Sequence, residues 1–306
     1  MIKRINISNN LQGVLLALIA VVLWSGNFII SRKVSTQISP VSLAFYRWLT
    51  ASIVLIPFAW KPFAIEYRIA KKHWKIFFWL SLTGIALFNT FVYIAGHYTS
   101  AINMALIGTT SSPIFATAMA VIFLKERLGI YRIAGIFICI MGILLLLSKG
   151  SWAVLAAFHF STGDLWILAG AFSFAIYNVL ISKKPSEMSS LSFLFILFTL
   201  GTLMLFPFYL IEQNMSGLTH TQWDSVLISS IIYIGLGASV FAFWCWNIAI
   251  KKIGTGSTVL FGNLIVVFST LEAVVLLGEE ITTIHILSGV IVIIGLIIAN
   301  IKTKKY

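Results

Sequence analysis

Apolar residues occupy this chain in long, nearly unbroken runs that are separated by short polar stretches. A helix needs about 20 apolar residues to cross the roughly 30 Å hydrocarbon core of a bilayer. Ten segments reach about that length, and the expected spans are 13–31, 40–60, 76–96, 101–124, 130–147, 165–182, 191–211, 226–250, 255–278 and 284–301. The pattern predicts an all-α integral membrane protein of ten transmembrane helices, with long connections only at 61–75, 148–164 and 212–225.

The composition agrees with this pattern. Hydrophobic residues make up 59% of the chain and charged residues 10%, whereas a soluble domain carries about 25% charged residues. A net charge of +12 would by itself suggest nucleic acid or another anionic partner. The positions of the basic residues argue against that interpretation, and the expected partners are the lipid bilayer and a small-molecule substrate, with no nucleic acid.

Lysine and arginine concentrate on one side of the predicted membrane. If the N-terminus is cytoplasmic, 17 of the 21 Lys and Arg residues lie in cytoplasmic segments or at cytoplasmic helix ends, as the positive-inside rule requires. The sequence therefore predicts a multi-pass protein with cytoplasmic N- and C-termini. The plasma membrane, here a bacterial inner membrane, is the expected location.

The sequence repeats itself once. Gly13 corresponds to Gly163 at an offset of 150, and Leu124–Glu126 corresponds to Leu277–Glu279 at an offset of 153. Because five helices are an odd number, the second repeat must enter the membrane from the opposite side, which makes the repeats inverted. The expected organisation is a first five-helix repeat at 1–148, a linker at 149–162 and a second five-helix repeat at 163–306.

Several short motifs follow one another along the chain, and the one that ends the fourth span has a counterpart at the end of the ninth. They include Leu23–Phe28 (LWSGNF), Phe45–Trp48 (FYRW), Tyr98–Ala101 (YTSA), Phe123–Leu128 (FLKERL) and Leu276–Glu279 (LLGE). In their order and duplication they resemble the EamA-type transporters of the drug/metabolite transporter superfamily. The resemblance implies alternating-access transport of small metabolites, often amino acid efflux, with uptake or exchange as the alternative.

The chain departs from that resemblance at one position. EamA-type transporters often have a proline in the ninth span, where this chain has Val266, the counterpart of Pro113 in the fourth span. A proline removes a backbone hydrogen bond and breaks or kinks a helix. The departure therefore puts a break in the ninth helix in doubt.

Positions i, i+3, i+4 and i+7 of an α-helix lie on one face. By this rule, polar and aromatic residues share helix faces at matching places in the two repeats. The faces come from the first, third and fourth spans and from their counterparts, the sixth, eighth and ninth. The candidate substrate-binding residues are Trp24, Asn27, Asn89, Tyr93, Asn103, Thr110, Phe174, Tyr177, Trp244, Asn247, Asn263 and Thr270. Aromatic, amide and hydroxyl groups with little fixed charge suit a neutral, zwitterionic or aromatic solute.

Two interpretations of these faces remain open. Polar side chains that point into lipid are costly, so the faces either line a central cavity or bond neighbouring helices together. Tryptophans near a membrane surface also serve as interfacial anchors. The combined pattern favours a lined cavity, with Trp24, Tyr93 and Trp244 forming an aromatic cage.

Four charged residues are candidates for coupling or gating. Arg47 lies about 10 Å into its helix, either paired structurally or available to a substrate carboxylate. Glu272 is in the middle of the ninth span, either bonded to a buried partner or taking part in proton coupling. Glu126 and Glu279 end the fourth and ninth spans, either as gate braces or as plain interfacial carboxylates.

No motif indicates an enzyme. The sequence shows no nucleophile–base pair, no phosphate-binding loop and no cluster of metal ligands, so no catalytic residue, metal or cofactor is expected. A channel or a membrane sensor is the non-transport alternative. Glycines in the fifth and tenth spans, Gly135, Gly142, Gly289 and Gly295, allow close helix packing, and a homodimer is one arrangement in which they could be used.

Overall fold

The computed structural model describes residues 7–124, 129–148, 150–151, 153, 161–215, 221, 223–253, 258 and 261–299, which are helical apart from short connections. The first half contains α1 (Ile7–Lys33), α2 (Pro40–Lys72), α3 (Trp74–Leu80), η1 (Ser81–Leu87), α4 (Phe88–Ala95), α5 (Ala101–Leu124) and α6 (Ile130–Leu147). The second half contains α8 (Thr162–Leu180), η2 (Ile181–Lys183), α9 (Ser190–Met215), α10 (Ser225–Ile232), η3 (Tyr233–Phe241), α11 (Ala242–Ile253), η4 (Gly262–Leu264), α13 (Ile265–Leu277) and α14 (Thr283–Ala299).

Each predicted span corresponds to one helical pass, and within the described residues no strand occurs. Counted over the described residues alone, six passes are long and apolar enough to cross a membrane, and α6, α13 and α14 are shorter apolar helices. One boundary was wrong: the connection expected at 61–75 is largely helical, because α2 continues through Pro57 and Pro62 to Lys72. Prolines of this kind are tolerated in membrane helices where neighbouring groups satisfy the freed backbone.

The third and eighth passes are interrupted by π-helix at equivalent places. The segments η1 and η3 have the wider hydrogen bonding, and each continues into an α-helix, α4 and α11. Single π-turns are rare and occur frequently at functional sites. Their wider turns also rotate all later residues around the helix axis, so a face calculated at 3.6 residues per turn is displaced beyond them.

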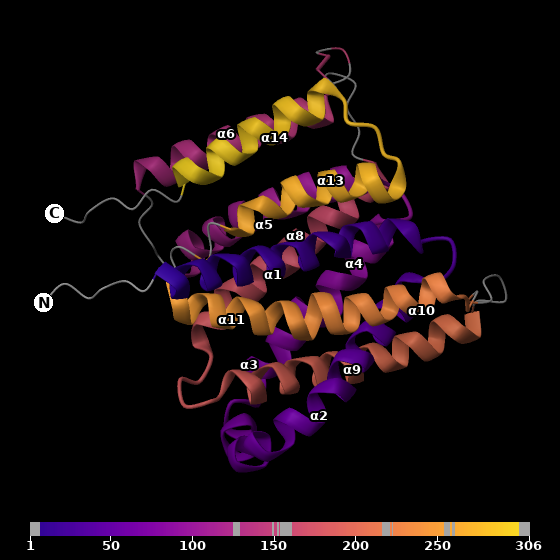
Figure 1. The fold of residues 1–306 in the computed structure, drawn as a ribbon, viewed down its shortest axis with the longest axis vertical. Coiled ribbons are helices and arrows are strands. Elements are labelled where there is room, and N and C mark those ends of the chain that lie inside the picture. Colours follow the sequence, from indigo (N-terminus) through magenta and orange to yellow (C-terminus); the bar gives the residue numbers. More distant parts are fainter. Residues whose placement is uncertain are drawn as a thin grey trace, which may run out of the picture.

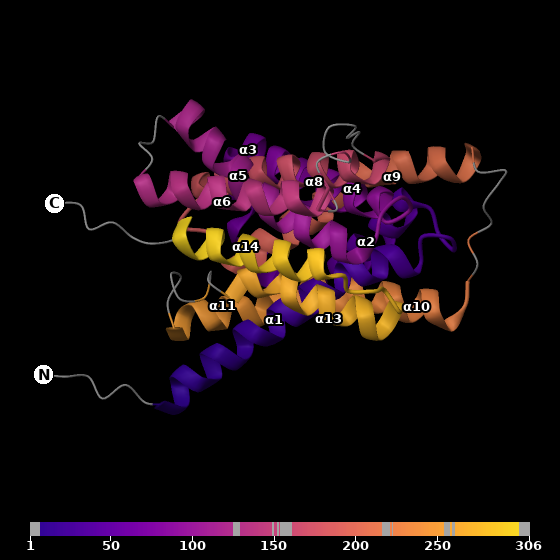
Figure 2. The same ribbon diagram turned by 90° about the horizontal axis from the view of Figure 1, so that it is seen from above.

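Helices from the two halves pair in antiparallel fashion (Figures 1 and 2). The C-terminal part of α9 reaches the start of α2, since Glu212 accepts hydrogen bonds from the backbone of Val41 and Ser42. In the opposite direction, Glu66 of α2 accepts from the backbone and side chain of Ser189, just before α9. Each helix thus supplies a carboxylate to the N-terminus of the other, where unpaired N–H groups need acceptors.

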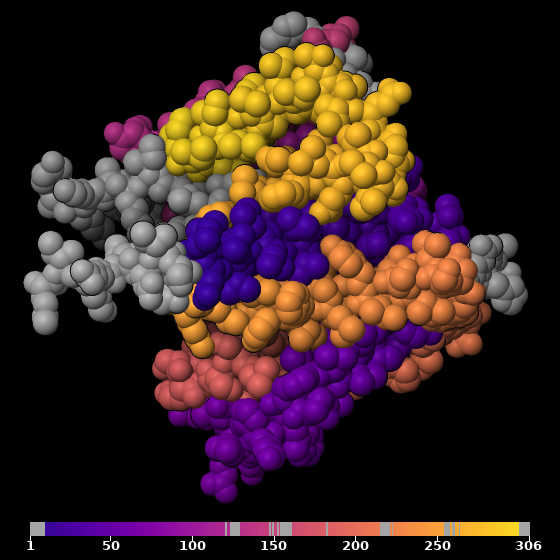
Figure 3. Space-filling view, in the orientation of Figure 1, coloured from indigo at the N-terminus to yellow at the C-terminus, as the bar shows by residue number. Residues whose placement is uncertain are grey.

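The remaining passes follow the same arrangement. The end of α13 meets the start of α5, and α6 lies antiparallel to α14, where Gly135 packs against Gly295 and Ala299. In addition, α1 packs along α11 and α8 packs along α4. The space-filling view shows α1 exposed between α13 and α11 on one face of the bundle (Figure 3).

Glycines of the fifth and tenth passes are used inside one chain. A Cβ on Gly135 would lie 2.4 Å from the backbone nitrogen of Ala299, and one on Gly295 would lie 2.7 Å from the sulfur of Cys139. A Cβ on Gly142 would lie 2.8 Å from Val292. These three glycines therefore let α6 and α14 approach each other closely, while the homodimer stays a prediction.

Candidate functional site: a buried arginine held by four helices

Arg47 is the centre of a buried polar cluster in the middle of the bundle. Its Nη1 donates to the amide oxygen of Asn27, to that of Asn89 at 2.7 Å and to the hydroxyl of Tyr93 at 2.8 Å. Its Nε donates to Ser239 Oγ at 3.0 Å. The five residues, which we call the Arg47 cluster, come from α1, α2, α4 and the π-helix η3.

The cluster is closed off from its surroundings. Arg47 is 4% exposed and Tyr93 1% exposed, and the guanidinium also lies 4.6 Å from the ring centre of Trp48. The arginine therefore does not extend to the membrane surface, and within the described residues its hydrogen-bond partners are all neutral. A buried cation is costly unless it is paired or fully hydrogen-bonded.

The donor count leaves part of the guanidinium unused. The group carries five N–H donors, and the hydrogen bonds to described residues involve only Nε and Nη1. Nη2, with two N–H groups, has no acceptor among them. A planar, always charged group with a free terminal nitrogen suits a carboxylate, which arginine binds through two parallel hydrogen bonds.

The predicted candidates Asn27, Asn89 and Tyr93 therefore lie together, and Tyr93 also donates to Asn27 at 2.9 Å. Ser239 was not among the sequence candidates. It lies inside the π-helix η3 and bonds the backbone oxygen of Ile234, five residues earlier. The sequence does not single out this serine. Its counterpart at the offset of 151 is the apolar Phe88, and the nearby Gly235 and Gly237 do not indicate a polar site.

Trp244 requires a correction. It was expected to face inward as the counterpart of Tyr93, but its side chain is 55% exposed and lies against Phe241. Trp24 instead packs on Phe243 and Trp246 of α11, with ring centres 5.3 Å and 4.9 Å apart. Both passes contain a π-helix, but η3 has nine residues and η1 has seven. The two passes are therefore not rotated alike, and an offset of 151 does not carry the face of Tyr93 over to Trp244.

The other aromatic candidates form a separate group beside α4. Phe174 stacks on Phe88, with ring centres 4.6 Å apart, and on Tyr177 at 5.4 Å. The Tyr177 ring lies directly over Gly84 in η1, where a Cβ would meet it at 2.3 Å. Phe174 and Tyr177 thus cover the π-helix of the third pass.

The polar stripe of the fourth and ninth passes does not join the Arg47 cluster through hydrogen bonds. Asn103 donates to Thr99, and Thr270 donates to the backbone of Val266. Thr110 is fully buried, and its hydroxyl has no partner among the described residues. Asn247 is half-buried on α11, and the side chain of Asn263 lies outside what the structure describes.

The ninth pass changes geometry although it has no proline. A 3₁₀ turn at Gly262–Leu264 precedes α13, so Val266 lies just after an irregular turn. The sequence had put such a break in doubt.

The two candidate acidic residues of the ninth pass have different surroundings. Glu272 Oε1 accepts a hydrogen bond from Ser25 Oγ at 2.7 Å, and Arg47 is not its partner. Glu279 accepts from the backbone nitrogens of Ala101 at 2.8 Å and Ile102 at 3.1 Å, so it caps α5. Its counterpart Glu126 lies outside the described residues.

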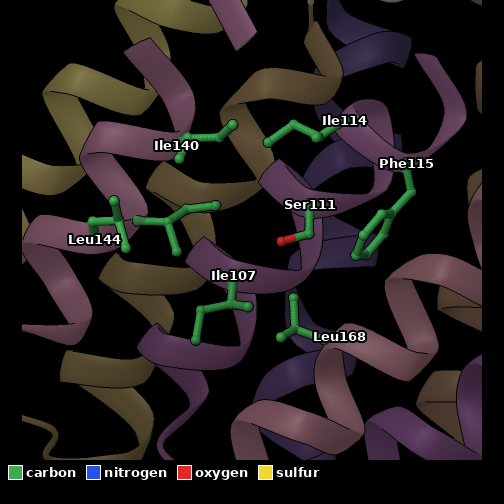
Figure 4. Close-up of a pocket in the computed structure, with 8 residues that line it drawn as sticks. Ile107, Ser111, Ile114, Phe115, Ile140, Leu144 and Leu168 are labelled. Carbon is green, nitrogen blue, oxygen red and sulfur yellow. The ribbon is translucent and has the colours of Figure 1, made fainter. Parts of the chain in front are cut away.

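An apolar cavity of about 190 Å³ lies elsewhere, between α5, α6 and α8 (Figure 4). Its lining residues are Ile107, Ser111, Ile114, Phe115, Ile140, Ile143, Leu144 and Leu168. One serine among aliphatic and aromatic side chains cannot replace the hydration of a charged or zwitterionic head group. The chemistry for such a solute is at the Arg47 cluster.

These features define a multi-pass helical membrane protein with a polar centre. The model of the EamA-like transporter family matches the chain twice, at residues 11–148 and 161–301. The chain belongs to this family and is a transporter.

Similar proteins extend over nearly the whole chain. An uncharacterized transporter of Archaeoglobus fulgidus is 28% identical over 297 residues, which cover 95% of this chain and 98% of that protein. A probable amino-acid metabolite efflux pump of Salmonella typhimurium is 25% identical, covering 92% and 93%. A protein of known crystal structure shares the fold with a TM-score of 0.62, 18% identity, and coverage of 94% and 96%.

Proposed function

We propose that this chain is a secondary transporter that exports small carboxylate-bearing metabolites, such as amino acids, across the plasma membrane by alternating access. The observation that carries the proposal is the buried Arg47, held by neutral partners and with Nη2 unbonded to the described residues. An arginine whose only role was structural would be expected to have a carboxylate partner or to use all its donors. A substrate carboxylate would supply the missing negative charge.

The partners of Arg47 pre-organise it for this role. Asn27, Asn89 and Tyr93 present oxygen atoms to one side of the guanidinium, so its plane is fixed without neutralising the charge. Binding then costs little side-chain entropy. The Trp48 ring, whose centre lies 4.6 Å from the guanidinium, supplies apolar surface next to it.

Two inverted five-helix repeats provide the mechanism of access. The antiparallel pairing of α2 with α9, of α5 with α13 and of α6 with α14 supports this organisation. In an inverted pair, one arrangement of the helices opens the centre to one side and its mirror opens it to the other. The closed Arg47 cluster corresponds to an arrangement between these two.

Export is supported by the similarity to the Salmonella protein, a probable amino-acid metabolite efflux pump. The plasma membrane is supported by the basic residues of the predicted cytoplasmic segments.

Purified protein in liposomes is expected to show saturable counterflow. Liposomes preloaded with an unlabelled amino acid should accumulate the labelled form transiently, because a carrier exchanges solute while its site changes sides. Flux would be measured for each of the twenty amino acids, with protein-free liposomes as the control. Flux that rises linearly with concentration and shows no counterflow would indicate a channel and contradict the proposal.

Cysteines at Thr36 and Ser186, both exposed in the short connections before α2 and α9, are expected to react from opposite sides of the membrane. The inverted arrangement places the start of α2 outside and the start of α9 inside. The two substitutions would be made separately in a Cys139→Ala, Cys245→Ala background and tested with a membrane-impermeant maleimide on whole cells and inverted vesicles. Reaction of both positions from one side would rule out the inverted arrangement.

A further inference from the structure

Glu272 is a carboxylate in the apolar middle of α13 that is not part of the Arg47 cluster. It is half-buried, and its Oε1 accepts the hydrogen bond from Ser25 Oγ at 2.7 Å. Its Oε2 is buried without a partner among the described residues. An ionised carboxylate at the centre of a span costs about 2.5–3.5 kcal/mol on insertion scales unless it is compensated.

The number of hydrogens at Ser25 favours a neutral Glu272. Ser25 Oγ lies 2.7 Å from Glu272 Oε1 and also 2.7 Å from the backbone oxygen of Val22. A hydroxyl has one hydrogen and two lone pairs, so an ionised Glu272 and Val22 would compete for that single hydrogen. If Glu272 is protonated, its O–H donates to Ser25, and Ser25 donates to Val22, so that both short contacts become hydrogen bonds.

The helices around Glu272 provide little compensating charge. The described part of α5 has no charged or titratable side chain, and the charges of α1, Arg32 and Lys33, are at its C-terminal end, seven or more residues from Ser25. From η3, the titratable side chain that reaches α1 near Ser25 is Tyr233, whose hydroxyl lies over Gly26. Its hydroxyl donates to the backbone oxygen of Leu23 rather than to the carboxylate.

Helix α1 connects Glu272 to the Arg47 cluster. Ser25 bonds Glu272 on one side of the helix, and Asn27 bonds Arg47. Residues two apart on an α-helix do not share a face, so α1 lies between the two charged groups. A change in the contact between α1 and α13 therefore also moves a residue that holds Arg47.

We infer that Glu272 is the site at which this transporter binds its coupling proton, an inference that rests on the proposed transport function. In the closed arrangement the carboxyl group holds the proton and donates it in a hydrogen bond to Ser25. When α1 and α13 separate and water enters, the proton leaves to water and the carboxylate is hydrated. One proton is bound and one released, with no other bond made or broken.

Infrared difference spectroscopy tests the protonation without any substrate. At pH 7, Glu272→Gln is expected to lose the C=O band of one carboxylic acid from the spectrum of the full-length protein. Glu279→Gln is the matched control, because the carboxylate oxygens of Glu279 both accept backbone N–H bonds, and this variant should leave the band unchanged. Ser25→Ala should keep the band but shift it, since its hydrogen bond is gone.

Transport tests the coupling. In liposomes, Glu272→Gln is expected to keep counterflow of the amino acid that wild type exchanges, while accumulation driven by a pH gradient falls to the level of protein-free liposomes. Full pH-driven accumulation by this variant would overturn the inference. So would a wild-type spectrum in which no carboxylic acid band is shifted by Ser25→Ala. If Glu272→Gln fails to fold, the inference is tested by Ser25→Ala and wild type alone. It is overturned if Ser25→Ala leaves the carboxylic acid band unshifted or if wild type shows no pH-driven flux. Wild type without any counterflow would instead overturn the proposed function and leave the infrared result standing.

Discussion

Arg47→Gln is expected to reduce counterflow of a carboxylate-bearing substrate by roughly ten- to a hundredfold. Glutamine retains a hydrogen-bond donor but not the charge, and a hydrogen bond to a charged group contributes about 1.5–3 kcal/mol. Each 1.4 kcal/mol corresponds to a tenfold change. The measurement is the initial rate of exchange in liposomes at equal protein content, with the concentration for half-maximal rate determined separately.

A purely structural arginine would give a different result. A substrate analogue in which an amide replaces the carboxylate should be transported poorly by wild type, and the preference for carboxylate over amide should disappear in Arg47→Gln. Arg132→Gln is the control, because Arg132 is exposed and bonds only the Thr117 hydroxyl among the described residues. If the variant loses rate but keeps the full preference, Arg47 supports the bundle and does not contact substrate.

Gly135→Ala is expected to destabilise the protein by about 1–3 kcal/mol, the usual cost of adding a methyl group to a tightly packed contact. The added Cβ would lie 2.4 Å from the backbone nitrogen of Ala299 and 2.5 Å from the oxygen of Gly295. Backbone atoms in a helix cannot move aside as a side-chain tip can, so α6 and α14 must separate. The thermal unfolding temperature in detergent reports the effect.

Gly289→Ala provides the matched control on α14, at a position that does not face α6. Its nearest neighbour for a new Cβ is Leu106 at 3.9 Å, an ordinary contact. Alanine in a helix is favoured over glycine by about 0.5–1 kcal/mol, so this variant should be as stable as wild type or slightly more stable. Equal unfolding temperatures for Gly135→Ala and Gly289→Ala would contradict the packing described for α6 and α14.

The apolar pattern was sufficient to predict the helical passes, because crossing a bilayer imposes a length and a composition that a single sequence displays. The polar and aromatic faces matched between the repeats placed Asn27, Asn89 and Tyr93 among the candidates, and these three meet at Arg47. Counting along an ideal α-helix could not place Trp244 or find Ser239. Both depend on the π-helix η3, which is two residues longer than η1. That difference is not apparent in a run of small and apolar residues.

The charged residues show a second limit. Repeat matching identified Glu279 by its counterpart Glu126, yet Glu66 and Glu212 do not match each other in the alignment of the repeats. They nevertheless have the same task, since each caps the helix of the other half. At the offset of 150 between the repeats, Glu66 falls about one helical turn away from Glu212. A fixed offset therefore does not detect that the two residues are equivalent.

The mutual caps of α2 and α9 also impose an order on biosynthesis. The first turn of α2 receives the Glu212 carboxylate from a residue 170 positions later in the chain. During synthesis the first five helices are therefore inserted before the Glu212 carboxylate exists. The N–H groups at the start of α2 receive this acceptor only after α9 has been synthesised. A ribosome that stalled within the sixth pass would leave a product whose helix ends have lost their partners, a feature by which the cell's quality control could distinguish unfinished chains from finished ones.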